Sequence, residues 1–189
     1  MPNPYIITGG AWAVVITIWI VTSFTSKRTV RRQSIGSRLV QLCLVLIGAL
    51  LISGKGAVAI LLGWQVIPKS PSAADVGVLL TLTGIGLALW ARFALGKNWS
   101  GTVTLKQDHV LVQSGPYGIV RHPIYSGFLL ALLGTACLHG TLSAFFGVAI
   151  IALAFRLKSL TEESFMTEQF GQQYMAYKRT VKALIPFVW

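Results

Sequence analysis

Long apolar runs separated by short polar segments make up most of this chain. The first covers residues 5–24, which is about the 20 residues that a helix needs to cross a bilayer. The second covers residues 39–62, with Gly-Lys-Gly interrupting it at 54–56, and the third covers residues 76–95. A basic cluster follows the first run instead of preceding it, so this run is not a cleaved signal peptide. We therefore predict three membrane-spanning helices, with an outer loop at 64–74 between the second and the third.

The last apolar run is too long to be one membrane-spanning helix. A straight helix over residues 124–155 would be about 48 Å long, well beyond the roughly 30 Å hydrocarbon core. His-Gly-Thr at 139–141 provides a break, which predicts a hairpin of two short helices of about 15 residues each. The expected fold is thus all-α, a polytopic integral membrane protein with about five transmembrane helices, the last two forming the hairpin.

Two polar segments flank this hairpin. Residues 96–121 are too polar to span a membrane and longer than the usual connection of about 2–8 residues between bundle helices, which is typical of a functional segment. Residues 156–189 mix charges with aromatic rings, which predicts an amphipathic segment lying on the membrane surface. Its rings belong to Phe165, Phe170, Tyr174 and Tyr177.

Composition and charge agree with a membrane protein. Apolar residues make up 54% of the chain and charged residues only 11%, whereas a soluble domain carries roughly 25% charged residues. The net charge of +11 would suggest nucleic-acid binding in a soluble protein, but the positive-inside bias explains it better here. The basic cluster after the first run consists of Lys27, Arg28, Arg31, Arg32 and Arg38. We therefore expect the N-terminus outside and both polar segments, with the C-terminus, in the cytoplasm.

The densest group of chemically useful residues is GPYGIVRHPIYSG at 115–127. Gly-Pro predicts a turn, and Pro123 suits the first position of a helix because it has no amide hydrogen to leave unpaired. The positive end of that helix and the charge of Arg121 predict a site for an anionic group. Rings suited to a nucleoside and a carboxylate stand beside it on Tyr117, His122 and Tyr125. The alternative is that these are ordinary interfacial residues of an aromatic belt.

A second group follows the hairpin, and the hairpin should bring it next to the first. It consists of Arg156, Lys158, Glu162 and Glu163. In one interpretation a carboxylate holds a cationic or hydroxyl-bearing cofactor while a base fixes an anionic substrate. In the other, Lys158 and Glu162 only form a surface pair at i and i+4. Cys43 and Cys137 lie within apolar runs and no residues show metal-ligand spacing, so no metal site is predicted.

These groups, followed by FGQQYMAYKRTVKALIPFVW, resemble the isoprenylcysteine carboxyl methyltransferase family, a short prokaryotic-type member, and its relatives the phospholipid N-methyltransferases. The resemblance covers residues 89–189. It implies an N-terminal region at 1–75 that carries two transmembrane helices and the basic loop, and a methyltransferase core at 76–189. It also implies the cytoplasmic (inner) membrane of a prokaryote as the location.

The resemblance further implies S-adenosylmethionine as methyl donor. The residues that match the cofactor-binding positions of the family are His109, Val110, Leu111, Val112, Tyr117, His122, Pro123, Ile124, Tyr125 and Glu162, to which the helix terminus adds Arg121. The substrate-binding arginine of the family falls near Lys158, with Arg156 as the nearest true arginine, and Glu163 completes the acidic pair. These three are the expected catalytic residues.

The expected reaction is methyl transfer to a lipophilic acceptor, most simply an isoprenylcysteine-type carboxylate. A carboxylate is already ionised and needs only alignment and charge steering. A phospholipid amine or a small thiol would need a base, for which Glu163 or His122 is the candidate. Two further alternatives are an NADPH enzyme similar to sterol reductases and a non-catalytic membrane protein. The expected partners are membrane lipid and a lipophilic or prenylated substrate, and no nucleic acid.

Overall fold

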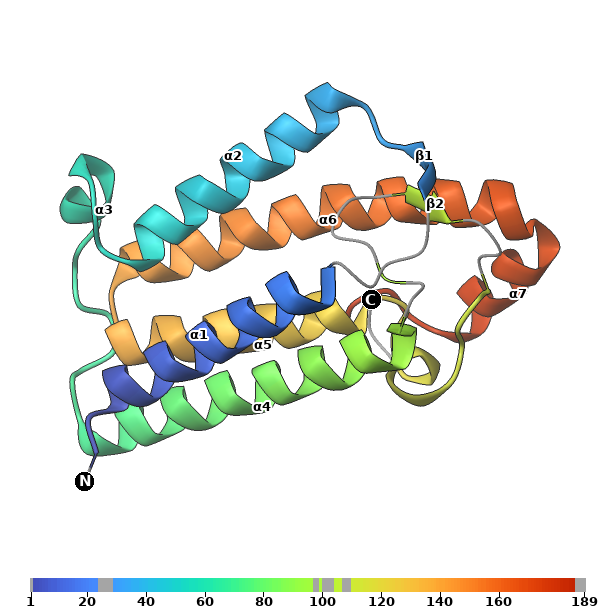
Figure 1. Ribbon diagram of the computed structural model, residues 1–189. Helices are drawn as coiled ribbons and strands as arrows, with labels where there is room; N and C mark the ends of the chain where they lie inside the picture. Colours follow the sequence, from blue (N-terminus) through green and yellow to red (C-terminus); the bar gives the residue numbers. More distant parts are fainter. Residues whose placement is uncertain (1, 24–28, 97–98, 100–103, 107–109, 186–189) are drawn as a thin grey trace.

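The computed structural model describes residues 2–23, 29–96, 99, 104–106 and 110–185. Five apolar helices run along one long axis (Figure 1). They are α1 (Pro4–Ser23), α2 (Ile35–Ile52), α4 (Pro71–Leu95), α5 (Pro123–His139) and α6 (Leu142–Phe170). All but α5, which has 17 residues, are long and apolar enough to cross a membrane. The predicted all-α polytopic fold is confirmed.

Small residues let the helices pack closely. On α4 and α5, a Cβ added to Gly84 would come within 2.3 Å of the Ala131 nitrogen, so the two backbones are nearly in contact. On α2 and α6, a Cβ added to Gly48 would come within 2.7 Å of the Gly147 carbonyl oxygen. Close approach of this kind is how membrane helices gain packing energy where lipid offers no hydrophobic driving force.

The break predicted at 139–141 is present, and the second apolar run, expected as one span over 39–62, divides at its Gly-Lys-Gly interruption. α2 ends at Ile52, and after Gly54 and Gly56, which both have positive φ, the short helix α3 (Ala57–Leu61) follows. The α5–α6 turn contains Gly140 at φ +69°, where an added Cβ would lie 2.2 Å from the side-chain nitrogen of Gln65. Glycine is therefore required in this turn for both its backbone angle and its lack of a side chain.

The predicted end of the hairpin at residue 155 is wrong. α6 continues unbroken to Phe170 as a 29-residue helix, so residues 156–170 extend the hairpin instead of starting a separate segment. Neither Gly nor Pro occurs between 156 and 170, and the helix ends only at Gly171, which has φ +49°. At about 43 Å, α6 is longer than the hydrocarbon core, so its second half projects beyond it. After Gly171 comes the short helix α7 (Gln172–Thr180).

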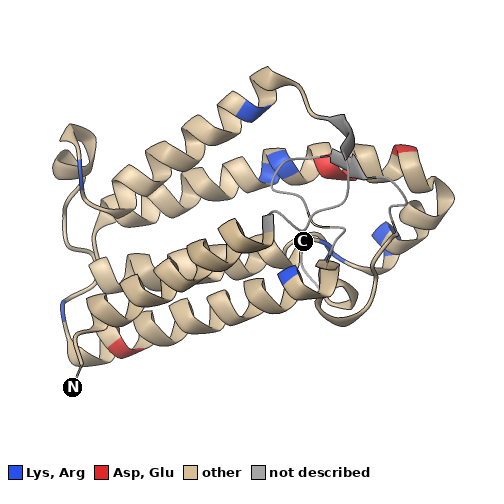
Figure 2. Cartoon of the chain, in the orientation of Figure 1, with Lys and Arg blue, Asp and Glu red and all other residues tan. Residues whose placement is uncertain are grey.

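A small sheet was not predicted. Strand β1 (Thr29–Arg32) pairs antiparallel with strand β2 (Thr104–Lys106), and the ribbon lies over the second half of α6 in Figure 1. The basic connection between α1 and α2 is thereby joined to the polar segment 96–121. Figure 2 shows most of the charged positions gathered toward this end of the molecule.

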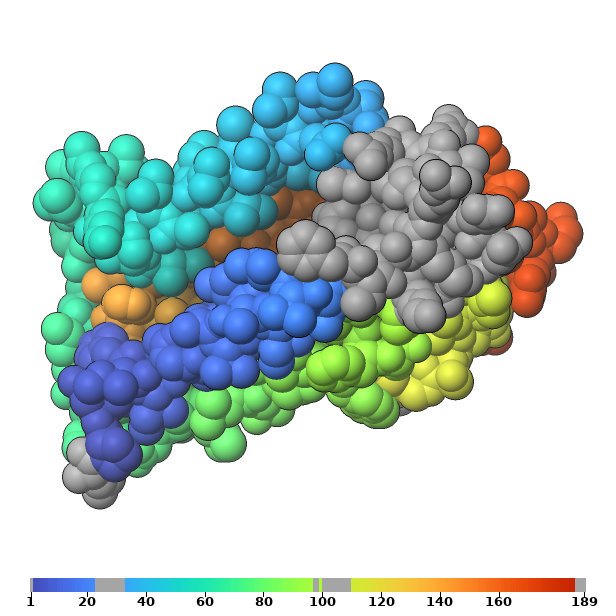
Figure 3. Space-filling view, viewed as in Figure 1, coloured from blue at the N-terminus to red at the C-terminus, as the bar shows by residue number. Residues whose placement is uncertain are grey.

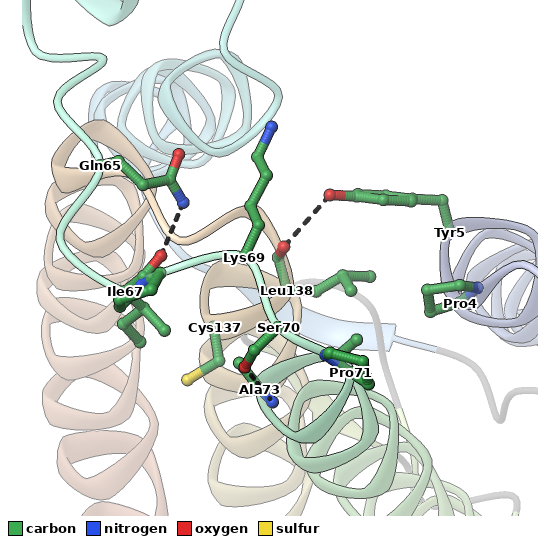
Figure 4. Close-up of a pocket in the computed structure, with 12 residues that line it drawn as sticks. Pro4, Tyr5, Gln65, Ile67, Lys69, Ser70, Pro71, Ala73, Cys137 and Leu138 are labelled. Carbon is green, nitrogen blue, oxygen red and sulfur yellow. Dashed lines mark hydrogen bonds between the residues drawn. The ribbon is translucent and has the colours of Figure 1, made fainter.

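A cavity of about 260 Å³ lies at the opposite end (Figure 4). Its walls are the start of α1, the connection 65–71 and the end of α5. The Tyr5 hydroxyl donates to the Leu138 carbonyl over 3.2 Å, and the Gln65 amide donates to the Ile67 and His139 carbonyls over 2.7 and 3.1 Å. These bonds tie the turns at this end together, far from the charged groups on α6.

Candidate functional site

The polar segment before α5 forms a buried turn against α4. The 3-10 turn η2 (Gly115–Gly118) carries Tyr117, which is buried and donates its hydroxyl to the Ala91 carbonyl over 3.4 Å. The carbonyl of Tyr117 in turn accepts the hydroxyl of Tyr177 on α7 over 2.6 Å. Burial raises the pKa of Tyr177 to about 12, so this hydroxyl keeps its proton and stays a donor.

The chain after α7 returns to the start of α5 and pairs with it. The backbone N–H groups of Arg121 and His122 donate to the carbonyls of Lys182 and Ala183 over 2.8 and 2.9 Å. One turn further along α5, the Ser126 hydroxyl donates to the Leu184 carbonyl over 2.6 Å. The segment 182–184 is therefore built into the wall of the site, which sequence reasoning missed because this pairing has no local pattern.

Glu163 is the buried centre of an ionic network. Its Oε1 accepts from Arg121 Nε over 3.1 Å and from a terminal nitrogen of that guanidinium over 2.5 Å, and its Oε2 lies 2.7 Å from Lys178 Nζ. The Nε2 atom of His122 lies 3.2 Å from the same Oε1. The side chain of Glu163 is only 5% exposed, so these donors surround it. The anion predicted beside Arg121 is supplied by the protein itself.

Glu162 points to the other side of His122 and is more open. The Tyr125 hydroxyl donates to its Oε1 over 2.5 Å, and Nδ1 of His122 lies 3.4 Å from its Oε2. Its side chain is 24% exposed, against 5% for Glu163. Of the two adjacent carboxylates, Glu162 is thus the one that retains access for a ligand.

His122 bridges the two carboxylates. Burial lowers the pKa of His122, but the hydrogen bonds to Glu162 and Glu163 raise it by more, so the pKa lies above its ordinary value. Both ring nitrogens face a carboxylate oxygen, and both carry a hydrogen only in the protonated ring. An imidazolium therefore fits this position better than a neutral base.

Aromatic rings line the side of the site that faces the bundle. The ring of Tyr125 stacks on His122 at 5.6 Å and on Phe155 at 4.9 Å, measured between centroids. Lys158 Nζ lies 5.5 Å from the centroid of the Tyr125 ring. Lys158 is therefore placed beside Glu162 and Tyr125, while Arg156 is a partly exposed residue on the same helix.

Only part of the segment 110–112 lies near the buried aromatic residues of the site. Val110 is 61% exposed, Leu111 is half-buried, and Val112 packs against the buried cluster around Tyr117 and Tyr125. His109 lies outside the described residues. Pro123 begins α5 as predicted, and Pro123 and Ile124 are buried.

Arg92 is a further buried charge that the motifs did not reveal. Its guanidinium donates to the carbonyls of Gly96 and Thr22 over 3.1 and 2.9 Å and lies 4.2 Å from the centroid of the Trp99 ring. A lone arginine within an apolar run was the available sequence indication, because such residues are costly in a membrane and usually have a role. Arg92 thereby joins the ends of α1 and α4.

The fold and the site together define a polytopic helical membrane protein with a cluster of ionic and aromatic residues where its hairpin leaves the bundle. A family model described as phospholipid methyltransferase matches residues 73–173, just over half of the chain. The chain therefore belongs to the phospholipid methyltransferase family, and the resemblance found in the sequence is confirmed.

Similar proteins carry related names. The chain is 31% identical over 117 residues to protein-S-isoprenylcysteine O-methyltransferase B of Arabidopsis thaliana, covering 60% of this chain and 59% of the relative. It is 35% identical over 101 residues to protein-S-isoprenylcysteine O-methyltransferase of Schizosaccharomyces pombe, covering 52% and 43%. The chain thus spans about half the length of these curated relatives.

A solved structure shares the fold. It is that of the eukaryotic intramembrane Ras methyltransferase ICMT, isoprenylcysteine carboxyl methyltransferase. The match has a TM-score of 0.58 at 22% identity and covers 100% of this chain and 69% of the other. At this identity the similarity concerns the arrangement of the helices.

Proposed function

We propose that this protein transfers a methyl group from S-adenosylmethionine to the carboxylate of a lipophilic, isoprenylcysteine-type acceptor at the cytoplasmic surface of a prokaryotic inner membrane. The observation that carries the proposal is the unequal pair of carboxylates on α6. Glu163 is enclosed by donors, whereas Glu162 is fixed by Tyr125 and His122 and remains partly exposed. The names of the relatives support the acceptor class.

The residues around Glu162 suit this cofactor. S-adenosylmethionine carries a positively charged sulfonium, an ammonium group and ribose hydroxyls, all of which a carboxylate such as Glu162 attracts or accepts from. Tyr125 and His122 hold the Glu162 carboxylate in place for these groups. When bound, the cofactor supplies an electrophilic methyl group. Tyr117, Val112, Pro123 and Ile124 form the buried support below these groups.

The protein's own residues divide the remaining work. Arg121, Lys178 and Glu163 hold α5, α6 and the segment 182–184 in fixed positions, so we assign them a positioning role. Lys158, and Arg156 two residues before it, place positive charge where an anionic acceptor would approach. The acceptor carboxylate is already ionised, so no proton has to be removed when its oxygen forms the new bond to the methyl carbon. The electron pair of the broken sulfur–carbon bond stays on sulfur. Alignment and charge steering therefore suffice.

The shape of the molecule fits a lipophilic acceptor. Figure 3 shows a hollow between α1 and α2 in which α6 is visible. A lipid chain lying in this hollow would stay in the membrane while its polar end reached the site. The polar cofactor would enter from the cytoplasm.

The test is methyl transfer from radiolabelled S-adenosylmethionine to S-prenylated cysteine acceptors in detergent. A carboxyl methyl ester releases its label as methanol in alkali, whereas an N-methyl or S-methyl product does not. Glu162→Gln should weaken cofactor binding by about tenfold or more, because a charged hydrogen-bond acceptor is lost. The matched control is Glu168→Gln, an exposed glutamate on the same helix. Alkali-stable label, or equal effects of the two variants, would contradict the proposal.

A further inference from the structure

A row of aromatic rings connects the site with the apolar part of the bundle. It begins at Tyr125, whose ring stacks on Phe155 of α6 with 4.9 Å between the centroids. The ring of Phe155 lies 6.4 Å from that of Phe128 on α5. Phe128 in turn lies 5.0 Å from Trp19 and 6.0 Å from Trp12 on α1. Three helices thus contribute to one continuous aromatic surface that starts at the site.

This row leads away from the charged end of the molecule. On α5, Phe128 follows Tyr125 by one turn, in the direction of the middle of the helix. On α6, Phe155 precedes Lys158 by one turn and Glu162 by two turns, and the three share one face of the helix. The ionic groups and the aromatic row are therefore two parts of one surface, polar at one end and apolar toward the membrane.

The two phenylalanines border the space among α1, α2, α5 and α6. One turn before Phe155, the side chain of Ile151 meets α2, where a Cβ on Gly48 would lie 2.5 Å from it. Phe155 itself stacks on Tyr125, so it faces between α2 and α5. Phe128 contacts rings of α1 and α6, and both phenylalanines are only half-buried. Figure 3 shows the hollow on this side of the molecule, between α1 and α2, with α6 visible in it.

The order of the groups matches the order of the parts in a prenylated acceptor. Lys158 Nζ lies 5.5 Å from the centroid of the Tyr125 ring, so a cation stands where the aromatic row begins. A carboxylate drawn to Lys158 would place the thioether sulfur of the same cysteine beside Tyr125 and Phe155. The isoprenoid chain would continue along the row toward Phe128, where large rings offer apolar surface for it.

We propose that Phe128 contacts the distal part of the prenyl chain of the acceptor and makes the enzyme selective for chain length, while Phe155 contacts the part next to the sulfur. This inference rests on the proposed function. A short chain ends before it reaches Phe128, so only a long chain gains the contact. Phe128 is thus a specificity-determining residue, and Phe155 serves chains of every length.

Two acceptors test the proposal, N-acetyl S-farnesyl cysteine and N-acetyl S-dimethylallyl cysteine. Each variant is compared with the wild type on the same acceptor, so that differences in partitioning into detergent cancel. Phe128→Leu should lower kcat/KM about tenfold for the farnesyl acceptor and less than about twofold for the dimethylallyl acceptor, because a few apolar contacts are lost with the long chain alone. Phe155→Leu should lower kcat/KM for both, and neither variant should change the KM for S-adenosylmethionine.

Controls separate this role from packing of the bundle. Phe146→Leu makes the same change at a 48% exposed position on the opposite face of α6 and should leave both acceptors unaffected. Phe128→Met, which is closer in volume to phenylalanine, should show the same selective loss and serves if Phe128→Leu does not fold. Equal losses for both acceptors in the Phe128 variants, or no loss for the farnesyl acceptor, would overturn the role of Phe128 alone. A wild-type protein that methylates neither acceptor would overturn the proposed function and this inference with it.

Discussion

At the scale of single residues, neighbours in the sequence have different environments. Glu162 and Glu163 are adjacent on α6, and their side chains are 24% and 5% exposed. Successive residues on a helix point about 100° apart, so one faces the network of Arg121 and Lys178 and the other faces Tyr125. A sequence motif of two acids predicts that both matter but not that their roles differ.

This difference in environment predicts different phenotypes for the same substitution at Glu162 and at Glu163. Glu163→Gln leaves Arg121 buried without its anion and should lower the free energy of unfolding by about 3 kcal/mol. Glu162→Gln should change stability far less and reduce cofactor affinity instead. Denaturant unfolding in detergent and calorimetric titration of S-adenosylmethionine measure the two effects. A Glu163→Gln protein as stable as the wild type would show that the network does not hold the site together.

His122 predicts a dependence of stability on pH. Its pKa in the folded protein is raised above the ordinary value, so its contribution is fully present below that ordinary value, about 6.5, and is lost as the pH rises through the folded pKa. The melting temperature of the wild type should therefore exceed that of His122→Gln most at low pH, with the gap narrowing above about pH 6.5. A gap that widens with pH would mean that the histidine is held in its neutral form.

At the scale of elements, the glycines of α4 differ in what they permit. A Cβ on Gly84 would meet the backbone of α5, whereas no atom lies within 4 Å of a Cβ on Gly86. Gly84→Ala should therefore cost about 1–3 kcal/mol through overpacking. Gly86→Ala should be neutral or stabilise by about 0.5–1 kcal/mol, because alanine favours the helix. Thermal unfolding of the two variants in the same detergent compares them directly, and equal melting temperatures would contradict the close α4–α5 contact.

Elements whose boundaries have local causes were predictable. The break at 139–141 and the interruption at 54–56 follow from glycine, and the start of α5 follows from Pro123. The continuation of α6 past 155 was missed because the first charged residues after the apolar run were taken as the end of the helix. A helix ends where its backbone leaves helical geometry, which in α6 happens at Gly171. The β1–β2 pairing and the pairing of 182–184 with the start of α5 each join segments that are distant in the sequence. Neither pairing could be predicted from a periodic pattern within one segment.

At the scale of the whole molecule, the site combines residues from separate helices, α5, α6 and α7. The motifs between 115 and 163 located Tyr125, His122 and the two glutamates correctly side by side. They did not locate Lys178 on α7, because its proximity to Glu163 depends on how α6 and α7 pack.

The arrangement in the membrane gives the last prediction. The start of α1 and the α6–α7 turn lie at opposite ends of the bundle formed by the apolar helices α1, α2, α4, α5 and α6. An excess of basic residues in the α1–α2 connection favours the cytoplasm for the end with the site. Single cysteines at Ser72 and Gln173, both exposed positions, report on the two ends in a protein whose own two cysteines are replaced. In intact cells a membrane-impermeant maleimide should label the cysteine at 72 and should label the one at 173 only after the membrane is permeabilised. The reverse pattern would invert the topology and place the site where cytoplasmic S-adenosylmethionine does not reach it.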